Sequence, residues 1–407
     1  MTEGTSALHT EKQEDFEQQP LTRVLAERVK GGDLGSWPVV IALVLIVVVF
    51  SQTAQNFFTP ANFTNIITQM AGTCLIAYGV VFVLLIGEID LSVAFISGVA
   101  GVVVAETQLP TGAHLPWYLC VFLAILAATL IGVFQGSIIA LIGVPSFVVT
   151  LAGYEIWQGV ILRSITQGVI VIQDSHINDF SNYLFSNTAG WIMASVVSAA
   201  YAGAAAWTVW NARRHHITVP NPVMLTLRVV VVVVISFLTV WILNKDRGVP
   251  LALLFMVGGL LVWTFVSKRT TFGRHVYAVG GNAEAARRAG INVARIRILV
   301  FAIAGGMSGL GGIVLAARLN SVDLNAGGGT LLIDAIAAAV IGGTSLFGGR
   351  GEMRNALIGA AMISTVSNGM FILGYSTGII FIVTGVILLF AVTFDTVVRR
   401  LQVRSGR

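Results

Sequence analysis

The sequence predicts an all-α, polytopic membrane protein with about twelve transmembrane helices. Of its 407 residues, 56% are hydrophobic and only 11% are charged, whereas a soluble globular domain carries about 25% charged residues because water must wet its surface. The mean hydropathy is +0.86, and apolar runs long enough to cross a bilayer recur along the chain. This composition excludes a soluble enzyme, a disordered protein and a secreted disulfide scaffold.

The apolar runs place the predicted spans in order along the chain. A stretch of about 17–25 apolar residues with few charges indicates a transmembrane helix. The tenth stretch is short and flanked by glycine, which favours a half-helix or a broken span. The twelve stretches lie at 37–54, 64–86, 91–107, 115–142, 146–165, 189–210, 223–243, 249–267, 296–317, 331–346, 355–373 and 377–396.

Both ends of the chain are polar. Residues 1–20 carry several acidic side chains against the single Lys12, so we expect 1–36 to be a disordered acidic tail in the cytosol. So long a polar segment before the first apolar run disfavours a cleavable signal peptide and makes the first span a retained anchor. Residues 397–407 are expected to form a basic cytosolic tail.

The basic residues predict the orientation. Lys and Arg accumulate in the cytosolic loops of membrane proteins. With the N-terminus inside, twelve spans put most of the 24 Lys and Arg residues on the cytosolic side, in 1–36, 211–222, 268–295, 347–354 and 397–407. This asymmetry predicts that both termini are cytosolic. It also explains the net charge of +5 as topogenic charge near anionic lipid, so that nucleic-acid binding is not needed.

The sequence has no phosphate-binding loop and no cysteine pattern of a metal site. The chain has no Gly-Lys dipeptide, so a Walker A phosphate loop is impossible. Its two cysteines, Cys74 and Cys120, lie inside apolar runs and are interpreted as small buried hydrophobic residues, not as a disulfide or a metal site. We therefore expect no cofactor and no metal, and a chain that is not itself an enzyme.

A few acidic residues near the membrane are candidate functional groups, because such charges are expensive there. Glu88 and Asp90 lie at the expected cytosolic turn between the second and third spans, and Asp90, two residues before Ser92, fits a helix N-cap. Asp334 opens the tenth span and also fits a cap. Glu155 and Arg163 share one helix face at two turns' spacing, where they could pair with polar groups of the bundle. The pattern leaves gating and scaffolding roles open.

The loop 268–295 is the largest predicted cytosolic loop, and it carries a short helix. Asn282 fits the N-cap, Glu284 lies in the first turn, and Arg287 and Arg288 lie in the last turn before Gly290. The predicted helix, 283–289, has about two turns, and helices under about 12–15 residues are marginal in water. Either its own protein or a partner must hold it, as when a membrane subunit presents a helix to a cytosolic motor.

Several segments together resemble one family. The chain resembles the ribose-type sugar permeases of ABC importers over about 37–396, and within them the xylose-type permease. The matching segments are 88–92, 144–147, 150–151, 247–250, 272–274, 277–287, 290–293, 334–338, 341–346 and 348–351. The resemblance implies a ten-span core with an inserted pair of spans at 189–243, which agrees with the twelve spans counted independently.

The resemblance implies a function and partners. The chain would be the permease of a bacterial inner-membrane importer for a monosaccharide, xylose or a similar pentose. It would work as a homodimer with a cytosolic ABC ATPase subunit, which would hydrolyse the ATP, and with a periplasmic sugar-binding protein. The loop 268–295 would be the coupling loop, with the ATPase contacts at Asn282, Glu284, Ala285, Arg287, Arg288 and Gly290.

Two departures from the family pattern concern the sugar. Leu332 stands where the family usually has Glu, and the polar motif of the eleventh span is 367–369, with Asn368 at its centre. The candidates for the translocation pathway are Glu155, Asn325 and Asn368. Two alternatives stay open: a proton-coupled secondary sugar transporter, in which carboxylates such as Glu155 carry protons, and a membrane scaffold.

Overall fold

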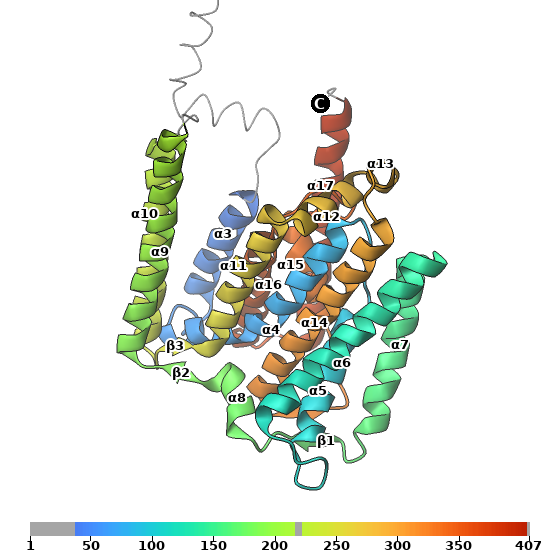
Figure 1. The fold of residues 1–407 in the computed structure, drawn as a ribbon. Coiled ribbons are helices and arrows are strands. Elements are labelled where there is room, and N and C mark those ends of the chain that lie inside the picture. The colour runs from blue at the N-terminus through green and yellow to red at the C-terminus, as the bar shows by residue number, and fades with distance from the viewer. Residues whose placement is uncertain (1–36, 216–221, 405–407) are drawn as a thin grey trace, which may run out of the picture.

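Helices make up most of the protein, and one lies in each of the twelve predicted apolar segments (Figure 1). The computed structural model describes residues 37–215 and 222–404, so the predicted tail 1–36, residues 216–221 of the loop 211–222 and residues 405–407 lie outside the described residues. The twelve helices are α3 (Trp37–Thr53), α4 (Pro60–Leu85), α5 (Val93–Thr107), α6 (Trp117–Ser137), α7 (Ser146–Ser164), α9 (Asn187–Arg214), α10 (Pro222–Asn244), α11 (Leu251–Arg269), α14 (Val293–Leu319), α15 (Leu331–Ile341), α16 (Met353–Ile372) and α17 (Thr377–Arg404).

Within the described residues, seven helices are long and apolar enough to cross a membrane: α4, α6, α9, α10, α11, α14 and α16. Helix α6 reaches its full length through a π-helical turn, η1 (Ile138–Ile142). The shorter apolar helices lie in α3, α5, α15 and the first half of α17. Three further helices, α8 (Ser175–Asn182), α12 (Thr271–Gly281) and α13 (Ala283–Arg288), connect the long ones. The fold is therefore that of a polytopic helical membrane protein.

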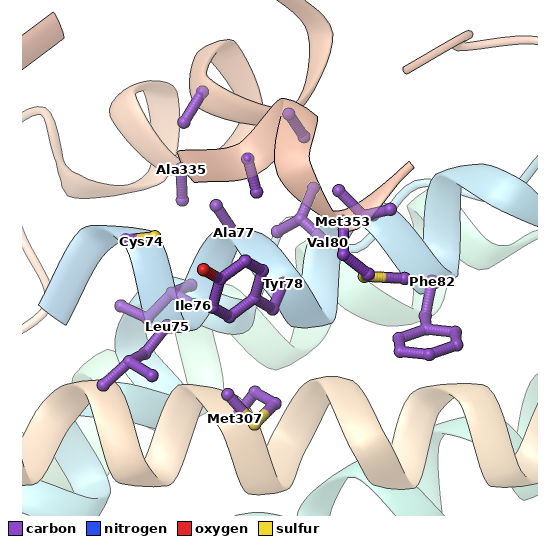
Figure 2. Packing of buried hydrophobic residues seen from close by; sticks show 14 of the residues in the cluster. Cys74, Leu75, Ile76, Ala77, Tyr78, Val80, Phe82, Met307, Ala335 and Met353 are labelled. Atoms are coloured by element: carbon purple, nitrogen blue, oxygen red, sulfur yellow. The ribbon is translucent and has the colours of Figure 1, made fainter. Parts of the chain in front are cut away.

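Helix α4 is the central helix of the bundle. Every residue in 70–85 is buried, as expected for a helix that is apolar all round. Figure 2 shows α4 between α14 and α15, with Tyr78 and Ala77 between Met307 and Ala335. The hydroxyl of Tyr78 donates a hydrogen bond to the carbonyl of Met256 on α11 (2.9 Å), so even the polar atom of this buried ring has a partner.

Glycines bring α6 and α14 into backbone contact. The sequence predicts close packing at two pairs with three residues between them, Gly132 with Gly136 and Gly305 with Gly309. A Cβ at Gly132 would overlap the carbonyl oxygen of Phe301, and one at Gly305 would overlap the carbonyl oxygen of Ala128. The two helices therefore pack at a separation that only glycine permits at these positions.

Two helices, α5 and α15, are too short to span a bilayer. They have 15 and 11 residues, or about 22 and 16 Å at 1.5 Å per residue, against a hydrocarbon core of about 30 Å. The segments that lead into them, 86–92 and 324–330, enter the bundle without helical structure. The segment 324–330 packs against α5, because a Cβ at Gly98 of α5 would overlap the carbonyl of Ala326. The short tenth segment agrees with the sequence, and α5 lacks only the first two residues of the predicted third stretch, 91–107.

Two short strand pairs hold the end of the bundle opposite α12 and α13 (Figure 1). Strand β1 (Val169–Val171) pairs antiparallel with β4 (Ser321–Asp323), in the register Ile170 to Val322. Strand β2 (Leu184–Phe185) pairs with β3 (Val249–Pro250) and closes the base of the α9–α10 hairpin. The side chain of Asn182 in α8 donates to the carbonyl of Ala317 in α14 (2.8 Å). These contacts fix the connections that the sequence left as loops.

Candidate functional site

The candidate site lies at the end of the bundle formed by α12, α13 and the start of α14 (Figure 1). Helix α12 was not predicted, because we interpreted 268–282 as loop. Its buried Val276 and Val279 show the apolar spacing that could have revealed it. The side chain of Thr270 caps its start by accepting from the amide of Gly273 (3.1 Å). Helices α12 and α13 thus form a continuous surface layer with only Asn282 between them.

Helix α12 is attached to the bundle through backbone contacts. At Gly280 a Cβ would overlap the carbonyl oxygen of Leu85, the last residue of α4, and the same oxygen accepts from the amide of Gly349 (2.9 Å). The hydroxyl of Tyr277 donates to the carbonyl of Gly351 (2.7 Å). Burial raises the pKa of Tyr277 and the charge of Glu352 raises it further, so this hydroxyl stays protonated and keeps donating.

Ion pairs join the same region at its surface. Lys268, at the end of α11, contacts Glu352 at 2.7 Å, and Arg354 contacts the other oxygen of that carboxylate. Exposed pairs of this kind contribute about 0–1 kcal/mol each. The backbone contacts at Gly280, rather than these pairs, therefore hold α12 in place.

Helix α13 occupies the position that the sequence predicts. The side chain of Asn282 caps it by accepting from the amide of Ala285 (2.9 Å). At the other end Gly290 has a φ of +85°, the left-handed conformation of a C-terminal stop, and the amide of Ile291 donates to the carbonyl of Ala286 (3.0 Å). A six-residue helix is thus fixed at both ends.

The two faces of α13 differ. Ala286 is 5% exposed and packs into the core, while Glu284, Arg287 and Arg288 point outward with side chains that are 57%, 65% and 80% exposed. Glu284 pairs with Arg287 (2.9 Å) and with Arg288 (3.5 Å) on the same helix. One buried alanine therefore anchors the helix and leaves a charged face free for a partner.

A hollow of about 330 Å³ lies beside α13. Its walls come from the end of α13, the connection to α14 and the π-helical turn η1, and two guanidinium groups line it. The lining residues are Ala140, Arg287, Gly290, Ile291, Asn292, Val293, Ala294 and Arg297. The exposed face and this basic hollow could together receive an acidic or polar surface.

The predicted cap residues lie where the 86–92 segment enters the bundle. Glu88 forms an ion pair with Arg297 of α14 (3.0 Å), a partner that the sequence did not indicate. The N-cap of α5 is Ser92, not Asp90 as we predicted; Asp90 Oδ1 instead accepts from the amide of Ser92 (2.8 Å). The sequence placed Asp90 in a cytosolic turn, but it is 4% exposed.

Asp90 and Ser92 belong to a buried polar cluster. The hydroxyl of Ser92 lies 2.6 Å from Asp90 Oδ1 and 2.9 Å from the Oε1 atom of Gln135 on α6. Gln135 is 2% exposed and was missed by the sequence analysis, because a single glutamine in an apolar run gives no spacing signal. Burial of a carboxylate is expensive, so the cluster fixes how the segment before α5 passes α6.

The remaining predicted residues do not converge. Thr330, not Asp334, is the N-cap of α15, and the Thr330 hydroxyl donates to Asp334 Oδ2 (2.7 Å). Asn368 is 8% exposed on α16. Glu155 of α7 and Asn325 before α15 are both exposed, and among the described residues no ion pair joins Glu155 to Arg163. The pathway candidates thus lie on three separate elements.

One sequence pattern has the letters of a hydrolase nucleophile motif. Residues 374–378 read Gly-x-Ser-x-Gly, with Ser376 at the centre. That motif requires a strand before the serine and a helix after it. In the structure residues 374–376 lie in the turn after α16, and 377–378 begin α17. A helix and not a strand precedes the serine, so the context of a nucleophile elbow is missing.

The architecture and the site define a class of protein. A multi-pass helical bundle, with short broken helices inside it and a short charged helix at one end, is that of a membrane permease. The model of one permease family, described as the permease component of the branched-chain amino acid transport system, matches residues 62–392. The chain belongs to this family of transport-system permeases.

Curated relatives narrow the resemblance. The xylose transport system permease protein of Escherichia coli (strain K12) is 36% identical over 379 residues, covering 91% of this chain and 94% of the relative. The corresponding protein of Haemophilus influenzae is 35% identical over 377 residues, covering 91% and 98%. The ribose import permease protein of Escherichia coli (strain K12) is 31% identical over 355 residues, covering 87% and 92%. No solved structure matches the chain.

These findings confirm the resemblance to sugar permeases of the ribose and xylose type. They give no support to the alternative of a secondary transporter. The chain is a multi-pass membrane permease, a translocation subunit and not an enzyme, as expected for a protein of the bacterial inner membrane.

Proposed function

We propose that the chain is the membrane subunit of an ATP-driven importer for a pentose such as xylose. The observation that carries this proposal is the match along almost the whole length of xylose permeases, 94% and 98% of the two relatives. The identity to the ribose permease is lower, at 31%. Leu332 and the motif around Asn368 would set the sugar preference within this class.

The ATPase subunit would dock on α13. The outward charges of Glu284, Arg287 and Arg288 and the basic hollow beside them support this assignment, since a helix of six residues survives there only because it is capped at both ends and anchored by Ala286. Asn282, Ala285 and Gly290 would act through the geometry of the helix and not through contacts of their own. The whole segment 268–295 would be the coupling loop.

The proposed topology has twelve spans with both termini in the cytosol: ten in a core and two, 189–243, as an insertion. The helices α12 and α13 lie at the same end of the bundle as the last turns of α17 and the end of α9, with Arg213 and Arg214 (Figure 1). This basic end would face the cytosol. The opposite end, with α8 and the β1–β4 pair, would face a periplasmic sugar-binding protein.

A second copy of the chain would complete the pathway. Glu155 is exposed in the middle of α7, among the exposed Leu151, Ile156 and Val160. A carboxylate facing lipid in mid-span is expensive, and such groups usually face a bundle interior or an aqueous cavity. In a homodimer packed through α7, Glu155 would face the space between the copies, where a polar sugar could pass.

Reconstitution tests the proposed function. Proteoliposomes that contain the full chain, its ATPase subunit and a loaded binding protein should take up xylose only when ATP is present. Omission of the ATPase is the matched control for a self-sufficient carrier. Uptake driven by a proton gradient without ATPase and ATP would refute the importer, and uptake of ribose but not xylose would refute the sugar assignment alone.

A further inference from the structure

The α9–α10 hairpin stands at the edge of the bundle, and its two helices contact the rest of the protein mainly at their β2–β3 end (Figure 1). Toward the other end, only Ala212 is buried among the described residues 199–215 and 223–239. The free part of the hairpin is therefore left almost uncovered by the other described helices of this chain.

A groove of about 220 Å³ runs between the two helices in this free part. Its walls are almost wholly apolar and, on α9, are mostly formed by alanine. The lining residues are Ala202, Ala205, Ala206, Val209, Leu225, Thr226 and Val229. Because alanines form one wall, the groove is shallow and open along its length, a shape that suits a flexible hydrocarbon chain better than a packed helix.

Two basic residues flank this groove, Arg213 one turn beyond its α9 wall and Arg228 beside its α10 wall. Arg213 follows Val209 by four residues and so continues the same face of α9. Arg228 directly precedes Val229 on α10. Both side chains are exposed, and among the described residues neither forms an ion pair. Arg214 lies beside them, with its guanidinium over the ring of Trp210 (5.2 Å).

The position of Arg228 in the helix favours the binding of an anion. It lies in the second turn of an apolar helix, about 9 Å from the residue that begins it at 1.5 Å per residue. A guanidinium at such a depth reaches toward the headgroup region with its long side chain, and basic pockets between membrane helices bind anionic headgroups. An apolar groove flanked by two guanidinium groups, neither of which forms an ion pair within the described residues, matches the two parts of a phospholipid.

We infer that the groove binds one acyl chain of an anionic phospholipid, whose phosphate contacts Arg213 and Arg228. The lipid would fill the space between the free ends of α9 and α10 and hold the hairpin at a fixed spacing. The inference does not depend on which sugar the permease carries or on the ATPase contact.

Native mass spectrometry of the full chain, released from detergent after addition of phosphatidylglycerol or of phosphatidylcholine with the same acyl chains, tests this site. We expect phosphatidylglycerol to bind at least several-fold more tightly. In the double variant Arg213→Gln/Arg228→Gln the two lipids should bind alike, whereas Arg213→Lys/Arg228→Lys should keep most of the preference. Equal binding by the unmodified chain, or an unchanged preference in the glutamine variant, would overturn the proposal.

A second variant separates the groove from general attraction to the basic residues. Ala206 is exposed at the rim, so Ala206→Leu should fill the groove without disturbing the helix contact, and it should weaken phosphatidylglycerol binding several-fold. Arg247→Gln, at the opposite end of the hairpin beside Asp246, is the matched control and should change nothing. Binding unaffected by Ala206→Leu would show that the lipid sits on the surface charges, and would overturn the groove site.

Discussion

The carboxylate of Glu88 lies 3.0 Å from the guanidinium of Arg297. The pair joins the segment that enters the bundle before α5 to the first turns of α14, directly after the proposed ATPase contact. Its side chains are 15% and 29% exposed, so water screens it less than a surface pair. It connects the start of α14, beside the α13 region, with the segment that carries Asp90.

We expect Glu88→Gln to lower the free energy of unfolding by about 1–3 kcal/mol, because a hydrogen bond to a charged group is lost and Arg297 keeps a partly buried charge without its partner. Thermal unfolding of the purified protein in detergent measures this change. The swapped pair Glu88→Arg/Arg297→Glu should recover part of the loss. A swapped protein that is no more stable than the single variant would show that the pair is not the cause.

Proline in α13 should separate membrane insertion from energy coupling. The amide of Ala286 donates to the carbonyl of Asn282 (2.9 Å), so Ala286→Pro removes this bond and costs about 3 kcal/mol or more in a helix interior. We expect normal insertion but loss of ATPase recruitment, measured by co-purification, and of ATP-driven uptake.

Ala283→Pro is the matched control, because Ala283 is the first helical residue, where proline is tolerated, and Asn282 before it already has an extended conformation. This variant should recruit ATPase normally. If Ala286→Pro failed to bind the ATPase and still transported sugar with ATP at the unmodified rate, the importer assignment would be wrong.

Charge reversal on α13 should affect docking more than folding. Arg287→Glu places a like charge beside Glu284, and such a pair destabilises a helix by only about 0.2–0.5 kcal/mol. We therefore expect an unchanged melting temperature and a loss of ATPase binding of tenfold or more. The double variant Glu284→Arg/Arg287→Glu restores the pair on the helix but not the outward charge pattern, so its ATPase binding should stay weak. Full recovery in the double variant would mean that helix stability, not docking, limits recruitment.

A side chain at Gly132 should separate α6 from α14. A Cβ there overlaps the carbonyl of Phe301, and overpacking of this kind costs about 1–3 kcal/mol or more. We expect Gly132→Ala to lower the melting temperature and the yield of monodisperse protein. Gly203→Ala on α9, where a Cβ meets nothing within 4 Å, should be neutral or slightly stabilising. Equal effects of the two variants would argue against the close contact.

Thiol labelling tests the proposed orientation. Ser175 begins α8 and Asn211 lies in the last turn of α9; both are exposed, and these helix ends lie at opposite ends of the bundle (Figure 1). Ser175→Cys should react with an impermeant thiol reagent from outside the cell, and Asn211→Cys only after permeabilisation. The unmodified chain is the control, because Cys74 and Cys120 are both 0% exposed. Labelling of both positions from the same side would contradict twelve spans with cytosolic termini.

Local sequence patterns predicted where the helices lie, but they did not predict how deeply residues such as Asp90 are buried. Asn282 and Gly290 identify α13 because cap and stop residues act within one turn, and the apolar runs identify the long helices because each must cover its own length of lipid. The burial of Asp90 depends on contacts such as that of Ser92 with Gln135, 43 positions apart, and the packing of Gly98 in α5 against Ala326 joins residues even farther apart. Such contacts leave no periodicity in the sequence.

The closeness of α6 and α14 at Gly132 and Gly305 has a mechanical consequence. Two helices that touch backbone to backbone have no side-chain layer between them that can repack, so they cannot slide past each other and must tilt as one rigid body. Helix α14 begins just after α13. A displacement of α13 would therefore rotate α6 and α14 together relative to the rest of the bundle. The non-helical segments 86–92 and 324–330, which adjoin the pair without being part of it, would then be the joints that flex.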